Sequence, residues 1–145
     1  MQSIVIIILV GLVGGIAVGL QSPLSSLLGQ KLGVLESVFI IHMGGAIVAL
    51  VPLLFLGGGR LSQWRSVPWY ALVAGAFGMI VIASFTYMIP RIGVAGSVIT
   101  VVTGQLIVGS VLDHFGLLGA SVREFDPARI FGITLMMVGV WITVK

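Results

Sequence analysis

Two polar side chains and a glycine in the second half of the chain are regularly spaced. Gln105, Gly109 and Asp113 are four residues apart in an otherwise apolar stretch, so on a helix they share one face. A charged side chain at the centre of a bilayer costs ~2.5 to 3.5 kcal/mol, and this face is therefore not expected to point at lipid along its whole length. The amide and the carboxylate are candidates to bind substrate or protons. In the alternative interpretation, Gln105 only joins helices through hydrogen bonds and Asp113 is a helix-end charge paired with Arg123 or Arg129.

Three further polar residues are candidates to line a transport pathway, namely Gln21, His42 and Tyr87. His42 shares a helix face with Gly45, and an imidazole can take up or release a proton during transport. The alternative role for His42 is a hydrogen-bonded packing residue. Gln21 closely precedes Pro23, so it either lines the pathway entrance or bonds to carbonyls that the proline frees.

The sequence shows no pattern of soluble-enzyme chemistry. His42 and His114 lie in different apolar segments, without the paired-histidine spacing of a zinc site. No serine has a histidine and a carboxylate placed to activate it, and the chain contains no cysteine. We therefore expect no enzymatic activity, no metal and no cofactor. The seven Lys and Arg residues are scattered singly, which argues against binding to nucleic acid.

The composition identifies an integral membrane protein that has the lipid bilayer as a partner. Hydrophobic residues make up 59%, charged residues only 8%, and the mean hydropathy is +1.27, whereas about a quarter of the residues in a soluble domain are charged. We predict an all-α bundle forming one transmembrane domain over residues 1–145. Its five spans, each near the ~20 residues that cross hydrocarbon, are expected at residues 3–28, 35–56, 67–89, 92–115 and 128–144.

Local signals mark where these spans begin, end and pack. Asp126 and Pro127 are typical of an N-cap and first position of the fifth span, Ser66 could cap the third, and the glycines at 57–59 should end the second. Pro90 and Arg91 should separate the third span from the fourth. Small residues that allow close helix packing are expected at Gly11, Gly15, Gly19, Gly45, Gly93, Gly104 and Gly109, with Gly132 and Gly139 on the fifth span.

The distribution of basic residues gives almost no orientation signal. With five spans, one side of the membrane receives Arg60, Arg65, Arg123 and Arg129, and the other receives Lys31, Arg91 and Lys145. A protein of fixed orientation normally carries a clear Lys and Arg excess on its cytoplasmic side. Two interpretations remain: an antiparallel homodimer of dual topology, or a paired homologous subunit that fixes the orientation. Antiparallel pairing would supply the inverted repeat on which many transporters are built.

Four blocks of the chain from Val67 onward form a recognisable set, namely Val67-Pro68-Trp69-Tyr70, Pro90-Arg91-Ile92-Gly93, Gly104-Gln105-Leu106 and Asp113-His114-Phe115-Gly116. They resemble the YdcZ-like family of the drug/metabolite transporter superfamily. The resemblance implies a multi-pass protein of the bacterial inner membrane, related to small multidrug transporters and to a family whose genes suggest inverted pairs. Those multidrug relatives carry a glutamate midway along their first helix that exchanges protons for cations. The first span here contains no acid, so the same antiport by that residue is not expected.

The sequence thus predicts a secondary transporter of small organic molecules that works by alternating access in an inverted dimer. Two alternatives stay open at this point. One is a small ion channel of dual topology, and the other is a non-transporting membrane subunit or assembly factor.

Overall fold

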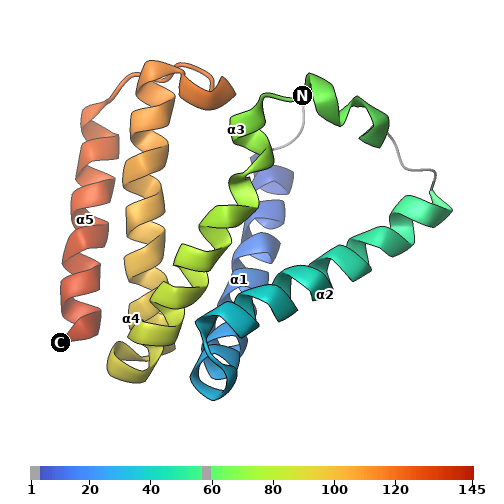
Figure 1. Cartoon of the computed structure of the whole chain (residues 1–145). Coiled ribbons are helices and arrows are strands. Elements are labelled where there is room, and N and C mark those ends of the chain that lie inside the picture. Colours follow the sequence, from blue (N-terminus) through green and yellow to red (C-terminus); the bar gives the residue numbers. More distant parts are fainter. Residues whose placement is uncertain (1–3, 57–59) are drawn as a thin grey trace. The chain divides into compact units, whose positions relative to one another are not determined.

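A computed structural model describes residues 4–56 and 60–145, and all regular structure among these residues is helical (Figure 1). The predicted all-α membrane fold is confirmed. The chain divides into two units, one up to Tyr87 and one from Met88 to Lys145. The boundary between them falls inside the longest helix, α4 (Phe77–Phe115).

The N-terminal unit begins with two contacting helices, α1 (Ile4–Leu32) and α2 (Val34–Phe55), joined by Gly33 alone. Gly33 has φ 107° and ψ 158°, a backbone conformation that glycine adopts without steric cost. The reversal between the helices therefore needs a single residue. Helix α1 extends past the predicted end at residue 28 and continues through Gly29 to Leu32.

Proline and small residues shape the C-terminal half of α1. Pro23 lies inside the helix, and two buried serines beside it bond to backbone carbonyls: Ser22 Oγ donates to Val18 at 2.6 Å and Ser25 Oγ to Gln21 at 2.9 Å. Gly29 faces Thr86 of α4 so closely that a Cβ at position 29 would overlap the threonine side chain. The small residues on this stretch therefore let α1 and the start of α4 approach each other.

The predicted third span is wrong over its first turns. Instead of one helix from residue 67, the chain forms η1 (Leu61–Ser66), α3 (Trp69–Leu72) and η2 (Ala74–Ala76) before α4 begins. Ser66 does not cap a helix, since its Oγ donates to the carbonyl of Gln63 at 2.8 Å. Gly75, which lies in η2, disfavours a continuous helix. The glycines expected to end α2, residues 57–59, lie outside the described residues.

The break between the third and fourth predicted spans occurs at Gly93 and not at Pro90 and Arg91. Gly93 has φ 74° and ψ 174°, which a residue with a side chain rarely adopts. Among the described residues, four helical stretches are long and apolar enough to cross a membrane: Ile4–Leu32, Val34–Phe55, Trp69–Phe115 and Pro127–Val144. The third has 47 residues, and as one straight helix it would measure ~70 Å against ~30 Å of hydrocarbon. The break at Gly93 divides it into two lengths suited to the membrane.

In the C-terminal unit the second part of α4 packs along α5 (Pro127–Val144) (Figure 1). A Cβ built on Gly139 would lie 3.5 Å from Ile99, and one built on Gly96 would lie 3.5 Å from Val144. The predicted start of α5 is confirmed, because the backbone N–H of Arg129 donates to Asp126 Oδ1 at 2.7 Å. Small residues therefore bring the two helices together near the C-terminal end of α5.

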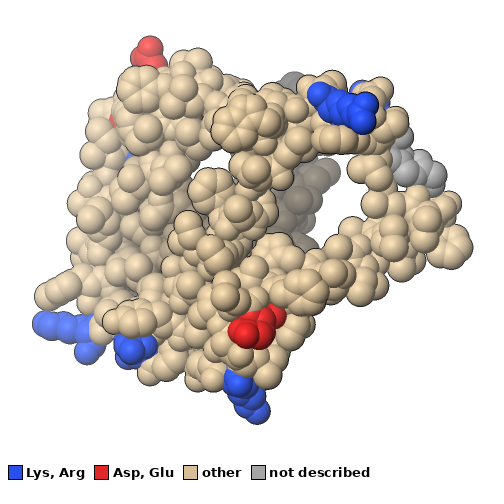
Figure 2. Space-filling view, in the orientation of Figure 1, with Lys and Arg blue, Asp and Glu red and all other residues tan. Residues whose placement is uncertain are grey.

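Other glycines expected to pack remain without a neighbour. Within the described residues, no atom other than those of the helix itself lies within 4 Å of a Cβ built at Gly11, Gly15, Gly19, Gly45, Gly93, Gly104, Gly109 or Gly132. Their role in packing stays a prediction. The surface of each unit is dominated by exposed apolar side chains (Figure 2), as expected for helices that face lipid. The charged residues lie in loops, in the end turns of helices or, for Arg91, two residues before the break at Gly93.

Candidate functional site

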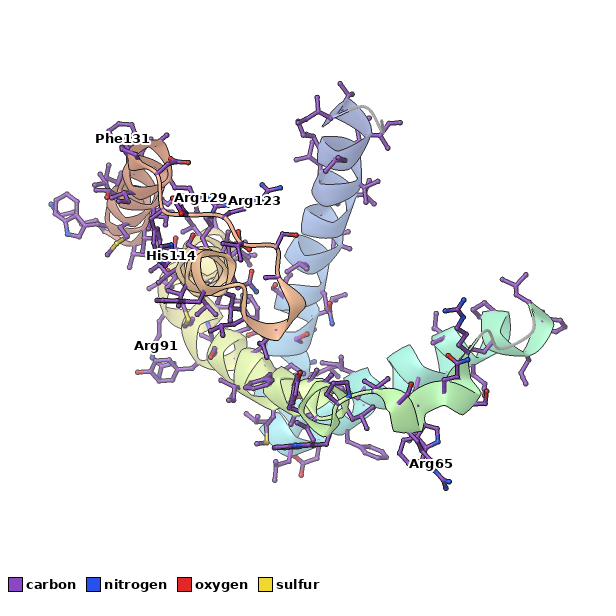
Figure 3. The ribbon with its side chains drawn as sticks, turned by 90° about the horizontal axis from the view of Figure 1, so that it is seen from above. Arg65, Arg91, His114, Arg123, Arg129 and Phe131 are labelled. Carbon is purple, nitrogen blue, oxygen red and sulfur yellow. The ribbon has the colours of Figure 1, made fainter. Side chains whose placement is uncertain are left out.

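An ion pair joins the end of α4 to the first turn of α5 in the C-terminal unit. Arg129 Nη2 donates to Asp113 Oδ2 at 3.0 Å, and the two side chains are 27% and 35% exposed. The expected pairing of Asp113 with Arg129 is thus confirmed. Arg123 instead uses its backbone, whose N–H donates to the carbonyl of Asp113 at 2.8 Å. Figure 3, a view from above, labels both arginines around the end of α4.

This ion pair forms part of a pocket of about 360 Å³ that lies wholly within the C-terminal unit. Its lining residues are Val102, Gln105, Leu106, Gly109, Ser110, Asp113 and Arg129. The face predicted from the spacing of Gln105, Gly109 and Asp113 therefore does border a single pocket. Arg129 was expected only as an ion-pair partner. Its position beside the pocket could have been inferred from the predicted N-cap at Asp126, because this cap places Arg129 in the first turn of α5.

The polar atoms of this pocket are incompletely paired. Arg129 Nη1 is buried and has no hydrogen-bond partner among the described residues, although Nη2 of the same guanidinium is bonded to Asp113. A buried donor without an acceptor costs about 1 to 3 kcal/mol. The pocket can thus offer an amide, a carboxylate and a guanidinium to a small molecule lying against apolar walls.

His114 holds the loop that follows α4. Its Nδ1 accepts a hydrogen bond from the backbone N–H of Phe125 at 3.3 Å, and its ring lies 4.8 Å from the ring of Phe125, centroid to centroid. Gly116 ends the helix in the left-handed conformation, with φ 61°. His114 therefore has a structural role that needs no ligand.

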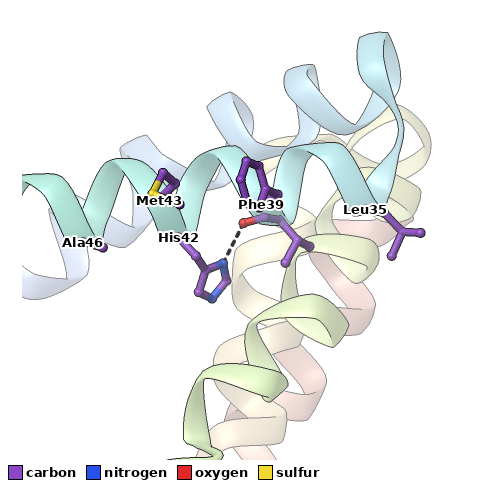
Figure 4. Close-up of a pocket in the computed structure, with 6 residues that line it drawn as sticks. Leu35, Phe39, His42, Met43 and Ala46 are labelled. Carbon is purple, nitrogen blue, oxygen red and sulfur yellow. Dashed lines mark hydrogen bonds between the residues drawn. The ribbon is translucent and has the colours of Figure 1, made fainter.

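His42 lines a separate, mostly apolar pocket in the N-terminal unit. The pocket has a volume of about 440 Å³ and is lined by Leu35, Val38, Phe39, His42, Met43 and Ala46 (Figure 4). His42 Nδ1 lies 2.8 Å from the carbonyl of Val38, so this nitrogen carries the proton and donates. Nε2 faces Gly78 of α4. This geometry leaves open both predicted roles of His42, packing and proton binding.

The comparison with known proteins decides the family. A family model described as "Putative inner membrane exporter, YdcZ" matches residues 6–142. The chain belongs to this YdcZ family. The inner membrane protein YdcZ of Escherichia coli (strain K12) is 27% identical to it over 150 residues, which cover 99% of this chain and 97% of the relative. No solved structure matches the chain.

Membership of the YdcZ family confirms several predictions made from the sequence. The chain is a multi-pass protein of the inner membrane, and it belongs with membrane transporters and not with enzymes. The family resemblance seen in the blocks around Pro68, Pro90 and Gln105 is confirmed as well.

The remaining candidates are distributed over the N-terminal unit. Gln21 is exposed on α1, and Tyr87 is exposed on α4. Neither is among the residues that line the His42 pocket. The serines beside Pro23 bond to the carbonyls of Val18 and Gln21, whereas the carbonyl that loses its N–H donor to the proline is that of Gly19, four residues before it. A pathway role for Gln21 and Tyr87 stays a prediction.

Proposed function

We propose that this YdcZ-family protein is a secondary transporter of small organic molecules that works by alternating access in an antiparallel dimer. The observation that carries the proposal is the pocket in which Gln105 meets the Asp113–Arg129 pair. Ionisable groups within membrane segments are costly and commonly mark substrate or ion pathways. The family supplies the general activity, since its description names an inner membrane exporter.

The even distribution of basic residues supports the antiparallel dimer. Within the C-terminal unit, Arg123 and Arg129 accompany the end of α4 and the start of α5, while Lys145 follows the opposite end of α5. The whole chain divides four against three, which gives little bias towards one orientation. Asp113 lies two residues before the end of α4. Two inverted protomers would therefore carry equivalent pockets related by a two-fold axis, and such inverted repeats underlie many transporters that work by alternating access.

Transport is tested by recording currents from purified protein in proteoliposomes on a solid-supported membrane. A panel of cations, organic anions, sugars and amino acids is applied at two pH values, with tracer uptake measured in parallel to detect electroneutral transport. We expect saturable transport of one class, with a half-saturation concentration that Gln105→Ala raises about tenfold or more. Unsaturable conductance would indicate an ion channel. No transport by folded protein, together with dependence on another chain for stability, would indicate a non-transporting subunit.

Orientation can be tested directly because the chain contains no cysteine. A single cysteine is placed at the exposed loop residue Ser121 or, as the complementary position, at Lys145. An impermeant maleimide then labels intact spheroplasts before and after permeabilisation. Dual topology predicts about half-labelling of each variant from outside. Complete labelling of one variant and none of the other would contradict the antiparallel homodimer.

A further inference from the structure

The position of Arg129 is unusual for a residue whose role is only structural. It occupies the third position of α5, where the positive end of the helix dipole disfavours a cation. Its guanidinium is also half satisfied, with Nη2 on Asp113 and Nη1 buried without a partner among the described residues. Buried polar groups in native proteins nearly always have a partner, and exceptions often signal a ligand. A hydrogen-bond acceptor from a bound molecule would remove this deficit.

The geometry of the guanidinium indicates which acceptor fits. Arginine presents parallel N–H donors in a planar fork that matches a carboxylate. Only one of the two Nη atoms of Arg129 bonds to Asp113, so the pair is not closed in the bidentate form. Nη1 is covered by protein atoms here, and a ligand would reach it only after the Arg129 side chain rotates towards the pocket that it already lines.

The charge balance of the pocket further restricts the chemical class of the ligand. Asp113 and Arg129 are the two charged residues that line it, and together they contribute no net charge. A cation would be attracted by Asp113 but repelled by Arg129, and an anion would face the reverse. A molecule that carries one carboxylate and one ammonium could replace the internal ion pair with two new ones, so neither charge is left unpaired.

We infer that this pocket takes a small zwitterion, whose carboxylate binds Arg129, whose ammonium binds Asp113 and whose apolar part lies against Val102 and Leu106. Gln105 adds an amide that can donate to the carboxylate or accept from the ammonium. The inference rests on the proposed function, since it names the substrate class of the same site. The inference can still be tested separately from the proposed function, because binding can be measured without transport.

The test uses purified full-length protein in detergent and the zwitterionic L-α-amino acids as probes. Each is compared with its amide, which is a cation, and with its N-acetyl derivative, which is an anion. A ligand of the native state raises the unfolding temperature in a concentration-dependent way. We expect at least one zwitterion to raise Tm, and its two derivatives to fail at the same concentration. If no zwitterion raises Tm, or if a derivative acts equally well, the inference is wrong.

Arg129→Lys separates ligand binding from structural pairing. Lysine keeps the charge and can still pair with Asp113, but it lacks the planar fork. We expect a Tm close to that of the parent protein without ligand, and a concentration for half-maximal shift raised about tenfold or more, as for a lost charge-assisted hydrogen bond. Arg123→Lys, a change outside the pocket, should leave both values unchanged. An Arg129→Lys variant with full zwitterion response would overturn the assignment.

Failure of the inference and failure of the proposed function give different results. Saturable transport of another class, with no competition by zwitterions, would contradict the zwitterion site and keep the transporter. Zwitterion binding in detergent without transport in proteoliposomes would keep the site and contradict the transporter.

Discussion

The imidazole of His42 on α2 lies in the space that a side chain at Gly78 on α4 would occupy. A Cβ built on Gly78 would stand 2.5 Å from Nε2 and 2.6 Å from Cε1 of that ring. The ring is held on its other side, where Nδ1 bonds to the carbonyl of Val38 at 2.8 Å. The two helices of the N-terminal unit therefore meet at this point through a histidine on one and a glycine on the other.

Gly78→Ala is expected to destabilise the protein by about 1 to 3 kcal/mol, the usual cost of overpacking. The added methyl group must push the His42 ring away from its hydrogen bond with Val38. Thermal or denaturant unfolding in detergent measures the effect. In a His42→Ala background the same change should instead stabilise by roughly 0.5 to 1 kcal/mol, the helix preference of alanine over glycine. Equal effects in both backgrounds would show that the His42 contact is not the cause.

Gln105→Ala is expected to lower the apparent affinity for the transported molecule about tenfold or more, through loss of an amide hydrogen bond in the pocket. Half-saturation of transport in proteoliposomes measures it. Ser121→Ala, in the exposed loop after α4, is the control and should leave transport unchanged. If Gln105→Ala, Asp113→Asn and His42→Ala all transport like the parent protein when folded, the site assignment is wrong.

Asp126→Ala should destabilise the C-terminal unit by about 1 kcal/mol, because it removes the acceptor for the N–H of Arg129 at the start of α5. Serine can also cap a helix, so Asp126→Ser should restore most of the loss. Glu124→Ala, a nearby exposed acid, serves as the control for the change in charge. Comparable losses in the Asp126 and Glu124 variants would point to charge and not to capping.

Leu118→Gly should stabilise the loop after α4 by about 1 kcal/mol, since Leu118 has φ 55° and the left-handed conformation costs a residue with a side chain about 1 to 2 kcal/mol. Leu118 is largely exposed, so little packing is lost. Leu117→Gly, next to it in η3 (Leu117–Gly119), tests the specificity of the effect. We expect that change to be neutral or destabilising. An equal gain in unfolding free energy in the Leu117→Gly and Leu118→Gly variants would contradict backbone strain at Leu118.

The sequence predicted those features that depend on local chemistry. Asp126 and Pro127 marked the start of α5 because capping and the fixed φ of proline act within one turn. The spacing of Gln105, Gly109 and Asp113 predicted a shared face because helical periodicity is regular. The broken start of the third span was not predicted, since apolar composition indicates a membrane segment but not whether it is one continuous helix.

The contacts that depend on two distant segments were harder to predict. Nothing in the sequence near Gly78 indicated that a ring from α2 would lie against it. Gly93 was assigned to packing, but its positive φ makes it the break in α4. A glycine can be required for space or for conformation, and the sequence does not distinguish these reasons.

Asp113 accepts two hydrogen bonds from residues that follow it. Its carbonyl accepts one from the backbone N–H of Arg123, and its carboxylate accepts one from Arg129. The connecting loop thus holds α5 against the end of α4, while the second part of α4 begins at Gly93, whose backbone can adopt many conformations. If the protein changes conformation, we expect the second part of α4 and α5 to rotate together, with Gly93 as the hinge. The pocket would then keep its lining residues together, and only the surroundings that it faces would change during transport.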